Sequence, residues 1–285
     1  MANTLSTYEL RHKYFQANLA VALRNALVTE AICNVDRSDL KTIENPYITN
    51  QAATIQAVAG TYSVSAMTTT DDTLTVSEEI IFGTHVFRFE ELTSNFNLMA
   101  DFMDDLTYSV AFKVDQYVLN KILDDATGAY TTPTGGFTTA ANVPVICANL
   151  ISKVAGYQSG IANGLFLVIE NTDVVGFAQA QVSSGFSYAD AALNNGFMAT
   201  YMGIDIYVVR SGLFTTATLG TLSATNSGHR LFGVKGIATF ASPRGIQYEE
   251  KGVSGKTGKE IVVSAVCGAK CWTPKAGLLI DITLA

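Results

Sequence analysis

The stretch FRFEELTSNFNLMADFMDDLTYSVAFKVDQYVLNKIL (87–123) decides the fold. Its apolar residues keep helical spacing over residues 94–124. The stripe consists of Met99, Phe102, Met103, Leu106, Val110, Val114, Tyr117, Val118 and Ile122. At about 1.5 Å per residue such a helix spans more than about 40 Å. The pattern therefore predicts a helix too long for a small globular domain, with Met99, Phe102, Leu106 and Val110 facing the C-terminal strands.

The segment before this helix changes character twice. Residues 6–30 predict an amphipathic helix, in which Ser6 and Glu9 form a capping box. Its apolar stripe is Phe15, Leu19, Leu23 and Leu27. Residues 33–46 lose this period and are expected to form an extended arm.

Residues 47–90 alternate threonines with apolar residues, which predicts strands that have one polar face. Asp71 and Asp72 are expected to mark the turn of a long hairpin. An isolated two-stranded ribbon is marginally stable in water. We therefore expect this hairpin to lie on another surface.

The segment after the long helix combines helices and strands, so the predicted fold class is α+β. The stretch TGAYTTPTGGFTTAAN (127–142) is punctuated by proline and glycine and predicts a loop. A helix follows, with Asn142 as its cap, Pro144 in its first turn, and an apolar face at Val143, Ile146, Leu150 and Val154. The remaining expected elements are a strand at 165–169, a helix at 172–182, a strand at 204–210 and mostly strand over 231–284.

The composition limits the function classes. Only 15% of the 285 residues are charged, against roughly 25% in ordinary soluble domains, so we expect much of the surface to be covered by further copies of the chain. A net charge of −7 does not favour tight phosphate binding. Four cysteines are too few for a disulfide scaffold. No secretion signal and no stretch of 18 apolar residues is found, which favours an intracellular chain without a membrane span.

Motifs that could carry chemistry have simpler interpretations. GKT at 255–257 lacks the earlier P-loop glycine, because position 250 is Glu, and it precedes a predicted strand, so we expect a hairpin turn. Cys267 and Cys271 would share one face of a strand, but two further zinc ligands are not near in sequence. We interpret both cysteines as small buried residues behind Trp272.

The remaining candidates are dispersed along the chain. His12, His85 and His229 have no nucleophile motif beside them. The acidic cluster of Glu90, Glu91, Asp101, Asp104 and Asp105 is interpreted as one exposed helix face. Arg11, Lys13 and Arg24 make the first helix basic, so it would contact nucleic acid or an acidic scaffold, or pack between subunits. We therefore expect no catalytic, cofactor-binding or metal-binding residue, and no enzyme.

The order of these elements resembles that of the major capsid proteins of tailed phages, the Hong Kong 97-type fold. Five segments carry the resemblance: 87–123 above, ALVTEAICNVDRSDL (26–40), LFLVIENTDVV (165–175), MGIDIYVVRSG (202–212) and RGIQYEEKGVSGKTGKEIVVSAVCGAKCWTPKAGLLIDI (244–282). The resemblance implies an N-terminal arm at 1–45 and an extended β-hairpin loop at 46–92. It also implies a peripheral domain with the spine helix at 93–135, an axial α/β domain at 136–232, and closing peripheral strands at 233–285.

The function implied by the resemblance is that of a coat subunit. Copies would form pentamers and hexamers of an icosahedral head that encloses double-stranded DNA without reading its sequence. The expected location is the virion, after assembly in the host cytoplasm. Scaffolding, portal and decoration proteins would be separate chains. The alternatives are an encapsulin-type nanocompartment shell, which has the same fold, and an unrelated α/β enzyme.

Some members of this family link their shells by isopeptide bonds between a lysine of the extended loop and an asparagine of a neighbour. Here no lysine occurs between Lys41 and Lys113, although Glu78 and Glu79 could act as the carboxylate. We therefore expect a shell held by non-covalent contacts.

Overall fold

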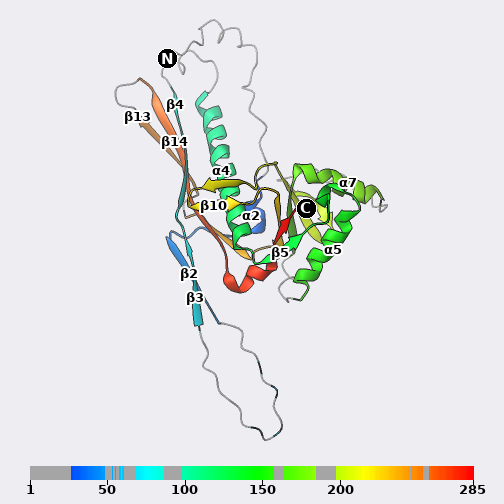
Figure 1. Ribbon diagram of the computed structural model, residues 1–285. Coiled ribbons are helices and arrows are strands. Elements are labelled where there is room, and N and C mark those ends of the chain that lie inside the picture. The colour runs from blue at the N-terminus through cyan, green and yellow to red at the C-terminus, as the bar shows by residue number, and fades with distance from the viewer. Residues whose placement is uncertain are drawn as a thin grey trace.

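A computed structural model describes residues 27–48, 53, 55, 58, 60, 69–86, 98–156, 164–183, 197–243, 245–252 and 257–285, with the side chains of 86, 98–104, 181–183 and 197–199 excepted. Figure 1 shows a body from which a ribbon projects at one end, and a long helix with long strands beside it at the other. The predicted first helix lies almost wholly outside the described residues. At its described end the prediction was wrong, because residues 27 and 28 are not helical and a separate short helix, α2 (Thr29–Ile32), begins after Val28 at its N-cap position.

The long helix is confirmed as α4 (Leu98–Asp125), with 28 residues. It packs on β14 (Lys259–Cys271), where Ile261, Val263, Ala265 and Cys267 alternate as buried residues. From α4, Leu106 and Val110 are buried, as expected for the face toward the terminal strands. The side chains of Met99 and Phe102 lie outside the description.

Strand β14 is the centre of a five-stranded sheet. On one side it pairs antiparallel with β13 (Ile246–Gly252), and along its first part with β4 (Glu78–Val86) on the other side. Its last residues pair with β12 (Ala238–Ala241), which pairs parallel with β1 (Asn34–Asp36). The β4, β13 and β14 part of the sheet stands beside α4 (Figure 1).

A six-stranded sheet forms the other half of the body. Its strands run in the order β5 (Gly128–Thr131), β15 (Leu279–Thr283), β11 (His229–Val234), β6 (Leu165–Glu170), β8 (Ile204–Val209) and β7 (Phe197–Tyr201). The pairs β15–β5 and β6–β8 are parallel, and the other pairs are antiparallel. Helices α5 (Asn142–Val154) and α7 (Val174–Ser183) lie at this end of the body (Figure 1).

One continuous core joins the two halves. It runs from Val28 and Ile32 through α4 and the predicted apolar face of α5 to Ile282. The Phe137 and Phe177 rings stack inside it at 5.5 Å between centroids. Two short strands, β9 (Thr216–Leu219) and β10 (Leu222–Thr225), form a separate hairpin. Short 3-10 turns lie at Gly136–Thr138, Asn171–Asp173 and Thr273–Leu278.

Several predicted details were wrong. Asp71 and Asp72 are not a turn, because both lie inside β3 (Thr69–Thr75). The expected extended arm at 33–46 is not without pairing, because it contains β1, which pairs with the distant β12, and most of β2 (Thr42–Ile48), which pairs with β3. The expected loop at 127–142 contains β5. Asn142 is the first residue of α5, and its amide donates to the carbonyl oxygens of Thr134 and Gly136.

Candidate functional site

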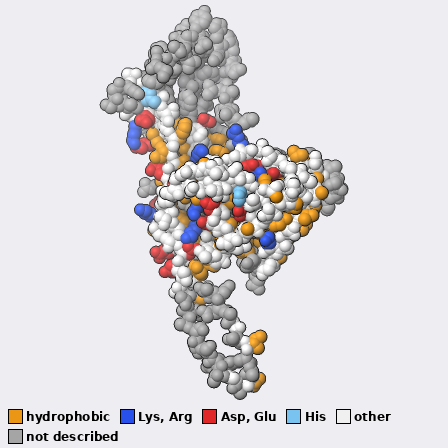
Figure 2. Space-filling view, viewed as in Figure 1, with side chains coloured by type: hydrophobic (Ala, Val, Ile, Leu, Met, Phe, Trp, Pro, Cys, Tyr) orange, Lys and Arg blue, Asp and Glu red, His pale blue; other side chains and the backbone are white. Residues whose placement is uncertain are grey.

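The most exposed feature is the projecting ribbon of β2 and β3. The strands pair antiparallel from Thr42 with Thr75 to Ile48 with Thr69. Beyond them, the side chains of Ile55 and Val58 are 101% and 102% exposed. Figure 2 shows hydrophobic side chains at this far end, well away from the body. Residues 49–68 contain no charged side chain. Because the ribbon tip is uncharged and carries uncovered aliphatic residues, it is a candidate contact surface for another chain.

A buried carboxylate fixes the base of the ribbon. Asp72 is only 7% exposed, and its Oδ2 accepts hydrogen bonds of 2.8 Å from both the N–H and the Oγ1 of Thr273. Its Oδ1 forms an ion pair with the Nζ of Lys270, which also donates to the Thr73 carbonyl at 2.8 Å. Burial disfavours the charged form, but the hydrogen bonds from Lys270 and Thr273 outweigh it and lower the pKa of Asp72.

A small second core lies beside the bonds that Asp72 forms with Lys270 and Thr273. It contains Leu74, Val76, Ala241 and Trp272, with the partly buried Ile43. The Trp272 Nε1 donates to the Thr239 Oγ1 at 2.9 Å. The expected alternation is therefore confirmed for the described part of the ribbon, since Leu74 and Val76 point inward while Thr73 and Thr75 are exposed. The bonds of Asp72 and this small core together fix the direction in which the ribbon leaves the body.

The sheet beside α4 has apolar residues that α4 does not cover. Phe82, Ile246 and Tyr248 flank the buried residues of β14, and they are 48%, 39% and 42% exposed. On the opposite face, Ile81 and Val266 are 55% and 40% exposed. All seven residues of β13 are exposed. This sheet is the second candidate contact surface.

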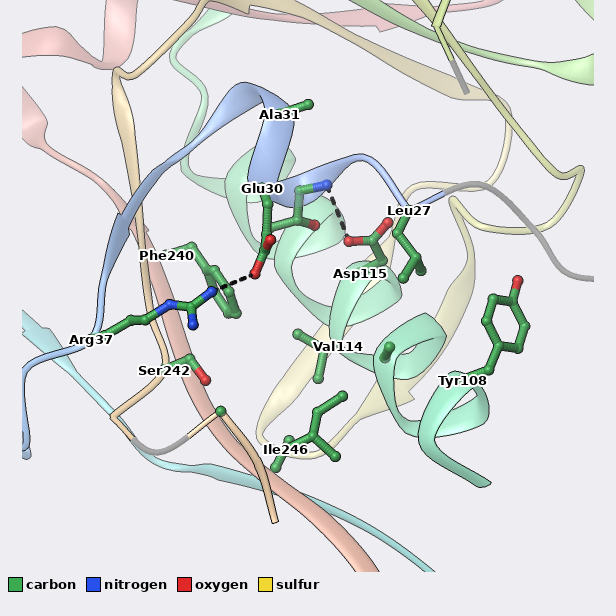
Figure 3. Close-up of a pocket in the computed structure, with 14 residues that line it drawn as sticks. Leu27, Glu30, Ala31, Arg37, Tyr108, Val114, Asp115, Phe240, Ser242 and Ile246 are labelled. Carbon is green, nitrogen blue, oxygen red and sulfur yellow. Dashed lines mark hydrogen bonds and ion pairs between the residues drawn. The ribbon is translucent and has the colours of Figure 1, made fainter. Parts of the chain in front are cut away.

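Two grooves run beside α4. The first, of about 810 Å³, lies between α2, α4 and β13 (Figure 3). In its wall, the Asp115 carboxylate accepts hydrogen bonds from the N–H groups of Val28 at 2.6 Å and Thr29 at 3.1 Å. Burial raises the pKa of Asp115 in spite of these bonds. Glu30 and Arg37 pair at 3.2 Å at the edge.

The second groove, of about 590 Å³, lies between β4, α4 and the β9–β10 hairpin. Glu78 is 8% exposed, and its carboxylate accepts hydrogen bonds from the N–H and the Oγ1 of Thr221. Gly220, at φ +62°, lets the hairpin approach: an added Cβ would lie 1.9 Å from the Glu78 Oε2. Glu78, considered above as a carboxylate for covalent linkage, instead joins β4 to this hairpin.

The motifs that were considered as candidate reactive sites lie on separate elements of the structure. The GKT stretch follows β13 and precedes β14 in the sequence, and these two strands pair antiparallel; the expected turn itself falls on residues 253–256, which lie outside the described residues. Cys267 and Cys271 are buried on one face of β14, and burial raises the pKa of both thiols to about 12. His85 lies on β4 and His229 on β11. Across the described ranges, no group of three or more His, Cys, Asp or Glu side chains could hold a metal ion.

The other predicted charged residues are only partly described. Asp105 is exposed, whereas the side chains of Asp101 and Asp104 lie outside the description, as do Glu90 and Glu91. His12 and the basic residues Arg11, Lys13 and Arg24 also lie outside it. Of the helices in the described part of the chain, none is long and apolar enough to cross a membrane.

Sequence reasoning missed a buried ion cluster in the six-stranded sheet. Arg230 is 3% exposed; its Nε donates to the Asp173 Oδ2 at 2.5 Å and its second terminal nitrogen to the Glu170 Oε2 at 3.0 Å. Glu170 also accepts the Gly212 N–H at 3.0 Å. The cluster joins β11 to the end of β6. The only signal in the sequence was Glu170 at the end of an apolar strand.

A second missed group joins α4 to the segment after β8. Asn120 is fully buried; its amide donates to the Leu213 carbonyl at 2.9 Å, and its Oδ1 accepts the Thr215 N–H at 3.3 Å. Asn226 donates to the Asp124 carboxylate at 2.9 Å. These bonds satisfy buried polar groups at a seam between the two halves of the body. They position the halves and offer no reactive group.

Comparison with known proteins decides the fold. No protein-family model and no curated protein sequence matches the chain. Among solved structures, the capsid of the cyanophage P-SCSP1u matches with a TM-score of 0.75 and 14% identity, over 95% of this chain and 92% of that chain. The chain has the fold of phage major capsid proteins. The mature capsid of bacteriophage PhiM1 matches this capsid fold with a TM-score of 0.70 and 12% identity, over 95% and 91%. The capsid of a native GTA particle matches with a TM-score of 0.67 and 13% identity, over 95% and 94%.

Proposed function

We propose that the chain is the major capsid protein of a tailed phage. Copies would assemble into pentamers and hexamers that form an icosahedral head around double-stranded DNA. The observation that carries the proposal is the uncovered ribbon tip on a chain with a capsid fold: Ile55 and Val58 are fully exposed, while Asp72 and Trp272 hold the ribbon base rigidly. Burial of these aliphatic side chains on a neighbour would contribute about 1.5–3 kcal/mol each.

We propose that the chain is divided in the same way as the Hong Kong 97-type subunit. The arm would be residues 1–45 and the extended loop 46–92, which holds most of the projecting ribbon. The peripheral domain would comprise 93–135 and 233–285, with α4 as the spine. The axial domain, residues 136–232, would gather around the five- and six-fold axes. Within it, the Arg230 cluster joins β11 to the end of β6, and the hydrogen bond between Asn120 of α4 and Leu213 supports a fixed orientation of this domain relative to α4.

The partners follow from this role. The chain would bind copies of itself, and separate scaffolding, portal and decoration proteins would act with it. A net charge of −7 supports enclosure of DNA without tight or sequence-specific binding. The subunit would be located in the virion after assembly in the host cytoplasm, and we propose no catalytic role, cofactor or metal. The similar structures above are capsids, which does not favour the nanocompartment or enzyme alternatives.

Electron microscopy of the expressed protein tests the proposal directly. We expect closed, regular shells from the wild-type chain. The double variant Ile55→Asp/Val58→Asp should stay folded, because these side chains contact nothing in the subunit, but it should form no shells. Thr69→Asp, on the same ribbon, adds an exposed charge without removing apolar surface and serves as the control. A wild-type chain that remains a compact monomer at high concentration would contradict the proposal.

A further inference from the structure

The groove between β4, α4 and the β9–β10 hairpin runs along one edge of β4. Residues 78–82 all line it. Successive side chains of a strand point to opposite faces, so an unbroken run of lining residues places the groove at the edge of the strand. Among the described residues, β14 is the only strand that pairs with β4. Every second residue of β4 therefore turns its N–H and C=O toward an edge where no described strand pairs with them.

The side chains around this edge leave apolar surface uncovered. Ile81 and Phe82 of β4 are 55% and 48% exposed. Phe112 of α4 and Leu219 of the hairpin, which line the opposite walls, are only partly buried. The groove has a volume of about 590 Å³. Covering these side chains with a further apolar segment would be favourable, because it removes their surface from water.

The two outer strands beside β14 differ in charge. The exposed β13 carries Glu249, Glu250 and Lys251, and charged side chains are one means by which proteins prevent further pairing at a sheet edge. Residues 80–84 of β4 are Ile-Ile-Phe-Gly-Thr and carry no charge. The edge of β4 is therefore open to an added strand, whereas the edge of β13 is protected.

The charges around the groove favour an uncharged occupant. Its acidic and basic lining residues balance, and they are Glu78, Glu79, Lys113 and Arg210. A charged segment would lose hydration in this groove without a net attraction in return. An extended segment would form main-chain hydrogen bonds with the edge of β4 and place alternate side chains over Phe82. The groove therefore fits an extended, uncharged and apolar segment.

The ribbon tip of a second copy has the required composition. Ile55 and Val58 are fully exposed there, and residues 49–68 contain no charged side chain. The tip of the same chain does not reach the groove, because it lies beyond β3, while β4 follows β3 and leads away from the tip (Figure 1). A contact between two different patches of identical chains is heterologous, and it builds rings or extended arrays.

We propose that the ribbon tip of one copy adds along the free edge of β4 in a second copy, within the groove between β4, α4 and the β9–β10 hairpin. The inference rests on the proposed shell function and names the surface that receives the ribbon. The hairpin wall is already in place in the single subunit, because the Glu78 carboxylate accepts hydrogen bonds from the N–H and the Oγ1 of Thr221.

Hydrogen exchange of the wild-type chain tests the added strand. Unassembled subunits and shells would be compared by mass spectrometry of their peptides. The amides of residues 78–84 should exchange several-fold more slowly in shells, because the outward N–H groups of β4 gain acceptors. Residues 246–252, on the charged outer strand, are the matched control and should change little. Shells with unchanged exchange at 78–84 would overturn this inference alone, whereas a wild-type chain that forms no shells would overturn the proposed function as well.

Cysteine linkage identifies the occupant. Ile55→Cys or Val58→Cys subunits would be assembled with Leu219→Cys subunits, all in a Cys33→Ser background that removes the one native cysteine that is not buried. After mild oxidation we expect linked dimers, with the joined peptides identified by mass spectrometry. Thr216→Cys is the matched control, because Thr216 is exposed on the same hairpin strand but does not line the groove, and it should link several-fold less.

The two measurements together separate the possible outcomes. Equal linkage at positions 216 and 219 would overturn the ribbon tip as the occupant. Slower exchange of β4 without any linkage would overturn it too, because another segment would then have added to the edge. Hydrogen exchange uses the wild-type chain, so the inference can be contradicted even if the cysteine variants do not assemble.

Discussion

At the residue scale, the Asp72 carboxylate ties the ribbon to the body. Asp72→Asn keeps the size of the side chain but removes the ion pair with Lys270, so we expect a loss of about 1–3 kcal/mol in the free energy of unfolding. Trp272 is the only tryptophan and lies in the small core beside Asp72. Its fluorescence, followed during equilibrium denaturation, should therefore detect the destabilised base of the ribbon. An unchanged denaturation midpoint would show that the ion pair contributes nothing to the free energy of unfolding.

The pH dependence of this contribution follows from its sign. The folded-state pKa of Asp72 is lowered, so the charged carboxylate stabilises the fold above its unfolded pKa of about 3.9. That stability is lost as the pH falls through the lower, folded pKa. The difference in the free energy of unfolding between wild type and Asp72→Asn should be largest at pH 7 and should decrease below about pH 4. A difference that is constant down to pH 3 would contradict this assignment.

Substitution of Gly220 tests how tightly the β9–β10 hairpin packs against β4. Gly220→Ala and Gly228→Ala both place a side chain at positive φ, at +62° and +80°, which costs about 1 kcal/mol. Only Gly220→Ala also forces a Cβ onto the Glu78 carboxylate, whereas nothing lies within 4 Å at Gly228. Thermal unfolding should therefore show the larger loss for Gly220→Ala. Equal losses would mean that the hairpin moves aside freely.

At the scale of elements, the buried face of α4 supports the body. Leu106→Asp would place a charge without a partner against β14, at a cost of several kcal/mol, and we expect insoluble protein. Thr107→Asp is the matched control, because Thr107 is the exposed neighbour on the same turn and should accept the charge. Solubility and circular dichroism of the two variants measure the effect. A soluble, normally folded Leu106→Asp would contradict the register of α4.

The elements found from the sequence were those whose pattern is local. The apolar stripe of α4 repeats over its described length, so Leu106 and Val110 could be placed correctly. In contrast, β1 pairs with β12 some 200 residues away, and three residues such as Asn34–Asp36 show no period. Asp72 resembled a turn residue because its partners, Lys270 and Thr273, lie at the other end of the chain. The Arg230 cluster was missed for the same reason.

At the scale of the whole molecule, we expect a shell without covalent links between subunits. The ribbon has no lysine, and Glu78 is already bonded to Thr221. Disulfides between subunits are not expected either, because Cys147, Cys267 and Cys271 are buried inside the subunit and Cys33 is only partly exposed. Particles boiled in detergent should give one band near 30.4 kDa, with or without a reductant. A ladder of higher bands from linked subunits on the gel would contradict this prediction.

The absence of charge at the ribbon tip also determines how proteases act on it. No lysine or arginine occurs from Thr42 to Phe87, so trypsin has no cleavage site in the most exposed part of the chain. Exposed loop tips are usually the first sites of proteolysis. An enzyme that cuts beside aromatic residues has sites in the ribbon, such as Tyr47 and Tyr62. Trypsin resistance therefore says nothing about whether the ribbon is covered, whereas loss of chymotrypsin cleavage on assembly would show the moment at which a neighbour covers it.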